Sequence, residues 1–435
     1  MTLLPKDHAC AQALRELGVA GDGPLTIGGI KAAKLIARFG SPLYAFDAAV
    51  LARRVDTVRA AFGPRVQVLW SVKANPSIAV TDCLRRHGAG AEIASLGELH
   101  VALAAGHAAA TLRFAGPGKT DAELAAALAA GLGCVHVESL AEVDALARLA
   151  TPHGVIAKVA IRVNFAQELA GSRLRMGGKS SRFGIDEQQV PAVIAAIAER
   201  PSLRLVGLHA YAGTQCFDAA AFVAHCTRVC TSMARWEHEL GAALDEIDLG
   251  GGFAVAAFVG DGSFDLVAAG AAVQRLLAEH DRAGRSWFLE LGRYLAAPAG
   301  VYLTRVVRTK VSGDEAQAVL DGGLHHHAAA TGLGSLLRRL PLLVCAEAVL
   351  RVGTPVTLGG PLCTPTDQFA EGAPMGPLVA GDTIAVLNAG AYGLTFSPVA
   401  FLSHPTPAEV LIENGIARLV RSRGEPRDAL RGQRI

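Results

Sequence analysis

Eight short runs of β-forming residues, separated by segments with helical spacing, constrain the fold of this chain more than any other feature. The separating segments 121–130, 140–149, 190–200 and 219–240 are rich in Ala, Leu, Glu and Arg. Eight strands that alternate with helices fit a (β/α)8 barrel, whose usual size is about 250 residues. The expected strands are 66–72, 91–94, 112–115, 134–137, 159–163, 205–211, 246–249 and 287–291.

The pattern changes after Gly300. Strand-like runs then follow one another across Gly, Pro and Asp turns, without regular helices, which is typical of a mainly β domain. These runs are 301–311, 316–320, 343–352, 355–358, 383–387 and 410–420. The β-type segment 42–46 lies outside the barrel strands, so we expect the N-terminal residues to join the β domain. The sequence thus predicts an N-terminal segment (1–46), a barrel (47–300), a β domain (301–421) and a charged, disordered tail (422–435).

Composition narrows the class of protein. With 435 residues, 51% of them hydrophobic, the chain can bury a large core. Its net charge of +2 gives no field that would favour nucleic acid or an anionic membrane. The eight cysteines have no Cys-x-x-Cys pair and no ligand-like spacing with histidine, so we expect reduced thiols, a cytoplasmic location and no metal site. We also expect no secretory signal and no membrane span, because the apolar stretches are too short or too charged.

Lys73 ends the first expected strand, before the turn Ala74-Asn75-Pro76. At the carboxyl edge of a sheet its stem would lie in an apolar wall, where loss of solvation favours a neutral amine that attacks aldehydes. A surface lysine just past a strand is the simpler alternative. Chemistry in such barrels gathers at the carboxyl ends of the strands, however, and these ends carry further candidate cofactor-binding residues: Glu92, His209, Tyr211, Thr214, Gly250, Gly251, Gly252, Glu290, Gly292 and Arg293.

Three of these features have complementary chemistry. The glycine run 250–252 exposes backbone N–H groups that can bind a phosphate, assisted by Arg293, although a glycine run can also be a tight turn. Glu290 offers a carboxylate in an apolar wall, although a structural ion pair with Arg293 is an alternative. Together with the amine of Lys73, they describe a site for the phosphate, ring nitrogen and aldehyde of pyridoxal 5'-phosphate.

Eight short motifs then occur in order along the chain. They are Ser-Val-Lys-Ala-Asn (71–75), Gly-Ala-Glu-Ile-Ala-Ser (90–95) with Gly-Glu-Leu (97–99), Ser-Arg-Phe-Gly-Ile (181–185), the segment 207–215, Gly-Gly-Gly (250–252), Glu-Leu-Gly-Arg (290–293), Gly-Gly-Pro-Leu-Cys (359–363) and Gly-Ala-Tyr-Gly (390–393). In this order they resemble the fold-type III pyridoxal-phosphate decarboxylases, the group of diaminopimelate, ornithine and arginine decarboxylases. The resemblance runs from about residue 28 to about residue 420.

The resemblance implies roles for the matched residues. Lys73 would be the Schiff-base lysine and Glu290 the partner of the ring nitrogen, while the glycine run, Arg293 and Tyr392 would hold the phosphate. Cys363 would protonate the Cα atom as a general acid, reaching the site from the β domain of a second subunit in a homodimer with shared active sites. A buried structural cysteine is the alternative, but the position of Cys363 in a turn favours catalysis.

Departures from the family's pattern bear on the substrate. Decarboxylases of free diamino acids usually carry an acidic residue after this cysteine, where it meets the distal ammonium of the substrate, and here the position is Thr364. Tyr211 stands in place of the histidine that stacks on the cofactor ring, and can stack through its aromatic face. Leu291 replaces a proline, a change that we expect to be tolerated.

Donor-rich residues follow in the β domain. His325-His326-His327 precedes Arg338-Arg339, and these side chains are either solvated surface or a site for an acidic group. With Thr364 and Asp367 they make the candidate substrate-binding set Thr364, Asp367, His326, Arg338 and Arg339. These features are similar to a branch of the family that acts on conjugated amino acids, including decarboxylases of citrate-based siderophore pathways and of carrier-protein-bound glutamyl groups.

Three hypotheses follow. The first is an α-decarboxylase of an amino-acid conjugate in siderophore or related secondary metabolism. The second is diaminopimelate decarboxylase of lysine biosynthesis, which Thr364 opposes. The third is a non-catalytic cofactor-binding homologue, which the presence of both Lys73 and Cys363 opposes. A racemase-like activity is a weaker alternative, because racemases of this fold pair the ring nitrogen with arginine rather than with a carboxylate such as Glu290.

Overall fold

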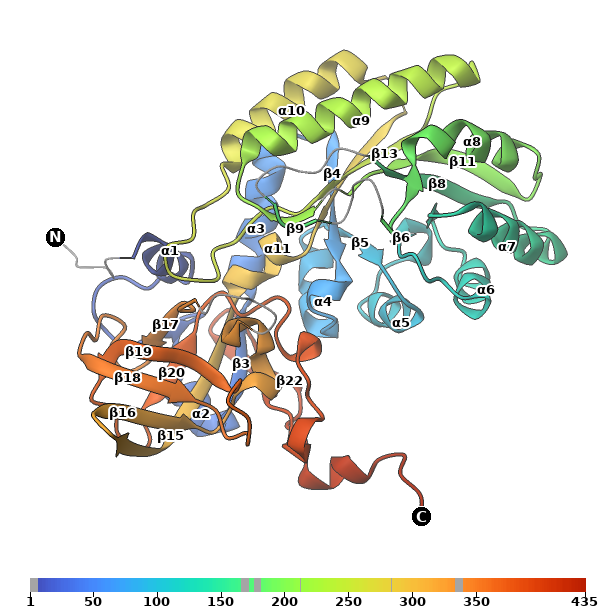
Figure 1. Cartoon of the computed structure of the whole chain (residues 1–435). Coiled ribbons are helices and arrows are strands. Elements are labelled where there is room, and N and C mark those ends of the chain that lie inside the picture. The colour runs from blue at the N-terminus through green and yellow to red at the C-terminus, as the bar shows by residue number, and fades with distance from the viewer. Residues whose placement is uncertain (1–6, 166–171, 176–180, 212, 283, 333–338) are drawn as a thin grey trace. The chain divides into compact units, whose positions relative to one another are not determined.

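A computed structural model describes residues 7–165, 172–175, 181–211, 213–282, 284–332 and 339–435 (Figure 1). The chain divides into two compact units. The barrel unit comprises Arg53–Ala254 and Phe264–Tyr294, and the β unit comprises Met1–Ala52, Val255–Ser263 and Leu295–Ile435. The predicted fold class, a (β/α)8 barrel with a mainly β domain, is confirmed.

The barrel unit is a closed ring of eight parallel strands. Strand β14 pairs with β4, and β7 pairs with β8, which closes the sheet. All eight expected strands are present, with ends within two residues of the prediction, because buried parallel strands are nearly continuous apolar runs. In ring order the strands are β4 (Val66–Ser71), β5 (Gly90–Ile93), β6 (Leu112–Phe114), β7 (Cys134–Val137), β8 (Ala157–Asn164), β11 (Leu203–His209), β13 (Glu246–Gly251) and β14 (Ser286–Leu291).

Helices follow the strands, and Figure 1 shows α4, α5, α6 and α7 on the outside of the sheet. Side chains cap three of these helices at their N-termini: Ser95, Thr120 and Ser139 each accept a hydrogen bond from the backbone N–H three residues on. The helices are α3 (Ala48–Phe62), α4 (Ile78–Arg86), α5 (Leu96–Ala104), α6 (Asp121–Ala129), α7 (Leu140–Ala150), α8 (Val190–Ala198), α9 (Ala219–Leu240) and α10 (Leu266–His280).

The β unit is built on a large mixed sheet. Strand β3, from the N-terminal segment, lies between β15 and β21, so the prediction that this segment joins the β domain is confirmed. The strands are β3 (Leu43–Asp47), β15 (Gly300–Ser312), β16 (Glu315–Leu320), β17 (Leu343–Cys345), β18 (Thr354–Gly359), β19 (Gln368–Gly376), β20 (Thr383–Val386), β21 (Ala408–Glu413) and β22 (Ile416–Arg421).

Three details of the β unit differ from the sequence prediction. The run 410–420 is a hairpin, because Asn414 and Gly415 both adopt positive φ angles (52° and 73°) that suit a two-residue turn. Strand β19 was not predicted, since Pro374 and Gly372 interrupt its apolar pattern. Only the first three residues of 343–352 form a strand, β17.

Smaller elements complete the described chain. They are α1 (His8–Glu16), β1 (Thr26–Ile27), β2 (Ile30–Lys31), α2 (Ala32–Phe39), β9 (Ser172–Arg175), β10 (Ile185–Asp186), β12 (Gly213–Cys216), α11 (Arg293–Ala296) and α12 (Leu324–His327). The tail 422–435, expected to be disordered, contains a 3-10 turn at Pro426–Leu430. Arg423 in this tail donates hydrogen bonds to the carbonyl oxygens of Phe39 and Pro42.

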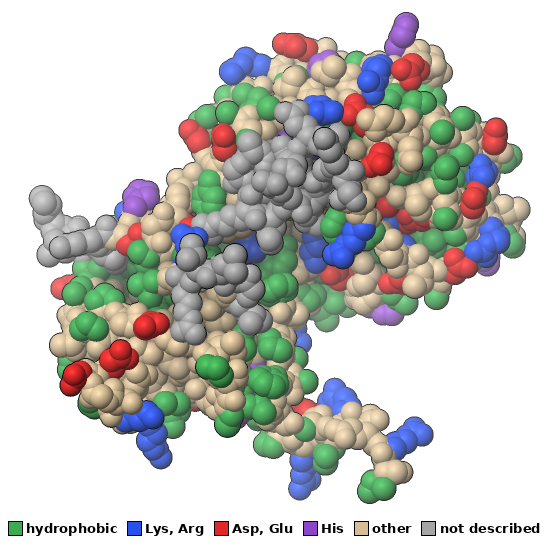
Figure 2. Space-filling model, in the orientation of Figure 1, with side chains coloured by type: hydrophobic (Ala, Val, Ile, Leu, Met, Phe, Trp, Pro, Cys, Tyr) green, Lys and Arg blue, Asp and Glu red, His purple; other side chains and the backbone are tan. Residues whose placement is uncertain are grey.

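Charge on the surface is mixed. Figure 2 shows acidic and basic side chains interspersed on the visible face, as the small net charge of the sequence leads us to expect. Among the helices that the structure describes, none is both long enough and apolar enough to cross a membrane.

Candidate active site

Lys73 and Glu92 form an ion pair at the carboxyl ends of neighbouring barrel strands. Lys73 follows β4 in a single 3-10 turn, and Glu92 belongs to β5. The Nζ atom of Lys73 lies 2.8 Å from each carboxylate oxygen of Glu92. Glu92 is buried, but 38% of the Lys73 side chain is exposed. The structure therefore places Lys73 at a strand end as predicted, but pairs its amine with a carboxylate instead of enclosing it in an apolar wall.

Glu98 and Tyr211 complete the surroundings of this amine. The Glu98 carboxylate accepts a hydrogen bond of 2.7 Å from the N–H of Ala94. Burial, and secondly the charge of Glu92, raises the pKa of Glu98 to about 7. The Tyr211 ring centroid lies 6.0 Å from the Nζ atom of Lys73, at the outer range of a cation–π contact.

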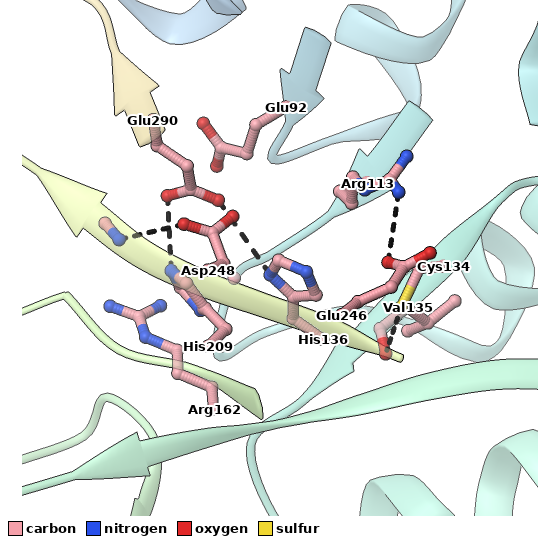
Figure 3. A network of polar contacts seen from close by, with 12 residues as sticks. Glu92, Arg113, Cys134, Val135, His136, Arg162, His209, Glu246, Asp248 and Glu290 are labelled. Carbon is pink, nitrogen blue, oxygen red and sulfur yellow. Dashed lines mark hydrogen bonds and ion pairs between the residues drawn. The ribbon is translucent and has the colours of Figure 1, made fainter. Parts of the chain in front are cut away.

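Glu290 lies in a buried polar cluster with His136, His209 and Asp248 (Figure 3). The Nε2 atom of His209 is 3.2 Å from Oε2 of Glu290, and the Nδ1 atom of His136 is 3.9 Å from Oε1. The two imidazole rings stack with centroids 4.4 Å apart. Burial is the largest cause that lowers the pKa of both histidines well below the usual value, so both rings are neutral at pH 7.

Asp248 supplies a second carboxyl group beside Glu290. Asp248 lies on β13 and accepts a hydrogen bond of 2.8 Å from the N–H of Gly250. Burial, followed by the nearby Glu290 carboxyl, raises the pKa of Asp248 well above its usual value. Two adjacent buried carboxyl groups cannot both ionise without a large cost.

The glycine run after β13 is crowded by neighbouring backbone. Gly250 and Gly252 have φ angles of 68° and 86°. A Cβ atom on them would lie 2.3 Å and 2.0 Å from the carbonyl oxygens of Ala210 and Gly213, so only glycine fits. The central Gly251 is equally close to the backbone of β14. A tight turn alone thus accounts for the three glycines, and their contact with a phosphate stays a proposal.

A buried ion pair borders the cluster. Arg162 on β8 lies 2.8 Å from Glu138, which also accepts hydrogen bonds from the N–H groups of Gly116 and Gly184. The guanidinium of Arg162 covers the Phe183 ring. The 181–185 motif is therefore held against the barrel by both a backbone hydrogen bond and a cation–π contact.

Three further candidates follow strand ends of the barrel unit. Thr214 belongs to the short strand β12, Gly292 follows β14, and Arg293 begins α11. A Cβ atom on Gly292 would lie 2.8 Å from the Ala74 side chain, so the loop after β14 packs directly against the turn that carries Lys73.

Cys363 lies in the β unit, between β18 and β19. It is exposed, whereas the other seven cysteines are buried, and none of the eight is in a disulfide. The alternative of a buried structural cysteine is therefore wrong. The hydroxyl of the next residue, Thr364, shares a hydrogen bond of 2.9 Å with that of Thr366, so this position offers no charge to a substrate.

The histidine run of α12 is buried, which contradicts the alternative of a solvated surface. His325, His326 and His327 have exposures of 0%, 2% and 5%. The Nδ1 atom of His326 lies 3.1 Å from the Tyr302 hydroxyl and its Nε2 atom 2.9 Å from the carbonyl oxygen of Pro405. Because both ring nitrogens have protein partners, the structure favours a structural role for His326 over the predicted substrate contact.

The contacts of Asp367 also favour a structural role over the predicted substrate contact. Its carboxylate accepts hydrogen bonds from the backbone N–H groups of Leu324 (2.6 Å) and Leu362 (2.8 Å). A Cβ atom on Gly323 or Gly360 would lie within 2.3 Å of the same carboxylate. Both oxygens therefore face protein backbone and tie the β18–β19 loop to α12.

The last candidates also belong to the β unit. Arg339 forms an ion pair with Asp261 and lies over the Phe258 ring, with 34% of its side chain exposed. Arg338 lies outside the described residues. Tyr392 has a positive φ angle of 53°, which is uncommon for a residue of its size. We therefore expect that this backbone conformation is kept because it directs the Tyr392 side chain to a particular place.

The barrel residues fit the cofactor that the sequence implies. Within the described chain, Oε1 of Glu290 is buried and has no hydrogen-bond partner, so it can accept the N–H of a protonated pyridine ring. The amine of Lys73 is accessible to an aldehyde, and the aromatic face of Tyr211 lies beside it. These groups have the chemistry that a pyridoxal ring requires.

Comparison with known proteins identifies the class. Residues 48–297 match the family described as "Pyridoxal-dependent decarboxylase, pyridoxal binding domain". The L-glutamyl-[BtrI acyl-carrier protein] decarboxylase of Niallia circulans is 35% identical, with 92% of this chain and 95% of that protein covered. The diaminopimelate decarboxylase of Zymomonas mobilis is 30% identical (95% and 97% covered). The 2-[(L-alanin-3-ylcarbamoyl)methyl]-2-hydroxybutanedioate decarboxylase of Staphylococcus aureus is 29% identical (84% and 92% covered).

The chain therefore belongs to the pyridoxal-dependent decarboxylases. It is an enzyme, a pyridoxal 5'-phosphate-dependent carboxy-lyase that acts on an amino acid or an amino-acid conjugate. The fold-type III resemblance inferred from the eight motifs is thereby confirmed.

Sequence reasoning missed three side chains of the site: His136, Asp248 and Glu98. His136 and Asp248 are each a lone polar residue within an apolar strand, Cys-Val-His-Val and Ile-Asp-Leu. A polar residue at an inward position of a barrel strand is costly unless it has a partner. A lone polar residue in an apolar strand is therefore the sequence signal for both His136 and Asp248. Glu98 lies in the Gly-Glu-Leu motif (97–99), to which the resemblance assigns no catalytic role.

Proposed function

We propose that this enzyme removes the α-carboxyl group of an amino-acid conjugate with an acidic tail, such as a citryl-linked diaminopropionate of a siderophore pathway. The observation that carries the proposal is Thr364, a neutral residue bonded to Thr366 where a carboxylate would meet a distal ammonium. The names of the Niallia circulans and Staphylococcus aureus relatives both describe a linked amino acid. The latter name describes an amide of a hydroxybutanedioate, which is an acidic tail.

The barrel residues would hold the cofactor and set its charge. When bound, pyridoxal phosphate takes up the electron pair left on Cα as CO2 departs. Lys73 would hold the aldehyde carbon through its amine, after giving up the proton that Glu92 now stabilises. Glu290 would accept the ring N–H through Oε1 and keep the ring cationic. Tyr211 would lie against the ring, and the glycine run with Arg293 and Tyr392 would bind the phosphate.

Cys363 would return a proton to Cα from its Sγ–H group. Its exposure distinguishes it from every other cysteine of the chain, which supports a contact with substrate rather than with the core. The proposal includes a homodimer in which Cys363 of one subunit serves the barrel of the other. None of the eight cysteines is in a disulfide, which supports the further expectation that the enzyme works in the reducing cytoplasm.

Diaminopimelate decarboxylase is the second candidate function, and the relative from Zymomonas mobilis favours it. A non-catalytic homologue is the third. Release of CO2 by the reconstituted enzyme separates them, with citryl-diaminopropionate, carrier-linked glutamate, meso-diaminopimelate, ornithine and lysine as substrates. We expect the kcat/KM for one of the conjugates to exceed that for every free diamino acid by about ten-fold or more, the contribution of one charge-assisted hydrogen bond. Efficient turnover of meso-diaminopimelate and of no conjugate would contradict the proposal.

A further inference from the structure

Two buried carboxyl oxygens in the barrel cluster lack a donor among the described residues. They are Oδ2 of Asp248 and Oε1 of Glu290, and Figure 3 shows the two carboxyl groups side by side. An ionised carboxyl group only accepts hydrogen bonds, so two ionised groups would leave both atoms unsatisfied. The ring N–H of a bound cofactor would supply one donor, to Glu290, but none to Asp248.

We propose that Asp248 keeps a proton in the folded enzyme and donates it in a hydrogen bond to Glu290. Asp248 is then a positioning residue, and Glu290 is the only anion of the pair. A single proton satisfies both oxygens, since Oδ2 becomes a donor and Oε1 an acceptor, and Oε1 keeps a second lone pair for the ring nitrogen. The contact between Oε1 and the ring nitrogen rests on the proposed function, but the proton on Asp248 does not.

The contacts of the two groups decide which one carries the proton. Glu290 has a hydrogen-bond contact of 3.2 Å between its Oε2 and Nε2 of His209, and Nδ1 of His136 lies 3.9 Å from its Oε1. Asp248 has one such contact, with the N–H of Gly250. Burial is the largest cause of the raised pKa of Asp248, and the charges of Glu290 and Glu92 act in the same direction.

The histidines do not take the proton instead. Their stacked rings lie 4.4 Å apart, so each would repel a charge on the other. Besides burial, the Arg162 guanidinium lowers the pKa of His209, and the nearby His209 lowers the pKa of His136. The amine of Lys119 donates to the backbone oxygen of His136 and adds a further positive charge there. The cluster therefore accepts its proton on a carboxyl group.

Infrared difference spectroscopy of the cofactor-free protein tests the proposal without turnover. A protonated carboxylic acid has a C=O stretching band that an ionised carboxylate lacks. At pH 7 we expect the wild-type minus Asp248→Asn spectrum to contain this band, and the wild-type minus Glu290→Gln spectrum to show only a shift in its frequency. A band that disappears with Glu290→Gln and persists in Asp248→Asn would place the proton on Glu290 and overturn the proposal.

Two substitutions at position 248 distinguish loss of the hydrogen-bond donor from a general effect of changing the side chain. The amide of Asp248→Asn still donates to Glu290, whereas Asp248→Ala does not. We expect Asp248→Asn to bind pyridoxal phosphate within a few-fold of the wild type, and Asp248→Ala about 10- to 100-fold more weakly, by absorbance titration. His107→Asn, at a buried histidine of the barrel unit outside the cluster, should change neither the band nor the affinity. Equal losses in both Asp248 variants, with native circular dichroism, would contradict the donor role.

A divalent cation is the competing occupant of the cluster. Ligand atoms of His136, His209, Asp248 and Glu290 lie within 4.8 Å of one another. Calorimetric titration of the cofactor-free protein with Zn²⁺ should show no stoichiometric binding that depends on Asp248. Such binding, lost in Asp248→Asn, would overturn the proposal in favour of a metal site. Failure of every conjugate to be turned over would refute the proposed function and leave the infrared result unaffected.

Discussion

The amine of Lys73 donates to both carboxylate oxygens of Glu92, at 2.8 Å each, across the ends of β4 and β5. This bidentate contact holds the Nζ atom in one place, although 38% of the side chain is open to solvent. Because an opposite charge favours the ammonium form, the amine must lose a proton before it can bond to an aldehyde. Glu92 is the nearest described group that can receive it.

We predict that Lys73 carries the cofactor. Borohydride treatment of the reconstituted protein should fix the mass of pyridoxal phosphate on the peptide that contains Lys73, because reduction makes the bond to an amine permanent. Lys119→Arg, which changes another lysine of the barrel unit, should be labelled at Lys73 as the wild type is. Label on a different lysine, or none after reconstitution, would remove the basis of the proposed site.

The fold could be predicted because the hydrophobic pattern of the sequence follows the alternation of strands and helices. Buried parallel strands are continuous apolar runs, and capped helices separate them. Strand β19 escaped prediction because Gly372 and Pro374 break its pattern. The Asn414-Gly415 turn is a hairpin signal, but the residues on both sides of it form one β-type run that predicts a single strand.

The site was predictable only in part, for a different physical reason. Lys73 and Glu290 are at strand ends, so topology alone brings them to one edge of the barrel. His326 and Asp367 were assigned to the substrate because they lie near motifs, but their polar atoms face the protein's own backbone and Tyr302. Sequence position does not reveal which way a side chain points once a loop folds back on itself.

Glu98 should make the stability of the protein depend on pH. Its pKa is about 7 in the folded state and ordinarily 4.5, so its contribution to stability is complete below pH 4.5 and is lost as the pH rises to 7. The loss is at most about 3 kcal/mol. Denaturant unfolding gives the free energy of unfolding of Glu98→Gln and of the wild type. We expect the difference, variant minus wild type, to be more positive at pH 8 than at pH 5. An identical difference at the two pH values would show that Glu98 is not titrating in this range.

Asp367→Ala should destabilise the β unit rather than weaken substrate binding. The substitution leaves the N–H groups of Leu324 and Leu362 without their acceptor, and a hydrogen bond to a charged group contributes about 1.5–3 kcal/mol. We expect a fall of about 3 kcal/mol or more in the free energy of unfolding. Thr366→Ala, a substitution in the same loop, should cost much less. A rise in KM with unchanged stability would restore the predicted substrate role of Asp367.

Mixed dimers should recover activity if subunits share their sites. Lys73→Ala and Cys363→Ala are each expected to be inactive, but a dimer that contains one of each would hold one intact site of two. Activity should therefore rise as the two variants exchange subunits, toward about one quarter of the wild-type value when exchange is random, since half the dimers are mixed and each has one of two sites. Each variant alone, carried through the same exchange treatment, is the control and should stay inactive. No recovery despite demonstrated exchange, or a fully active monomer, would rule the shared site out.

Thr364→Asp should shift substrate preference toward free diamino acids. A carboxylate at this position supplies the counter-charge for a distal ammonium, a charge-assisted hydrogen bond of about 1.5–3 kcal/mol, and it repels an acidic tail. We expect kcat/KM for meso-diaminopimelate to rise about 10- to 100-fold and that for an acidic conjugate to fall. Thr364→Asn introduces a side chain of the same size as aspartate without its charge, and is the matched control. It should change neither the kcat/KM for meso-diaminopimelate nor that for the acidic conjugate strongly. Equal effects of Asp and Asn would show that charge at position 364 does not select the substrate.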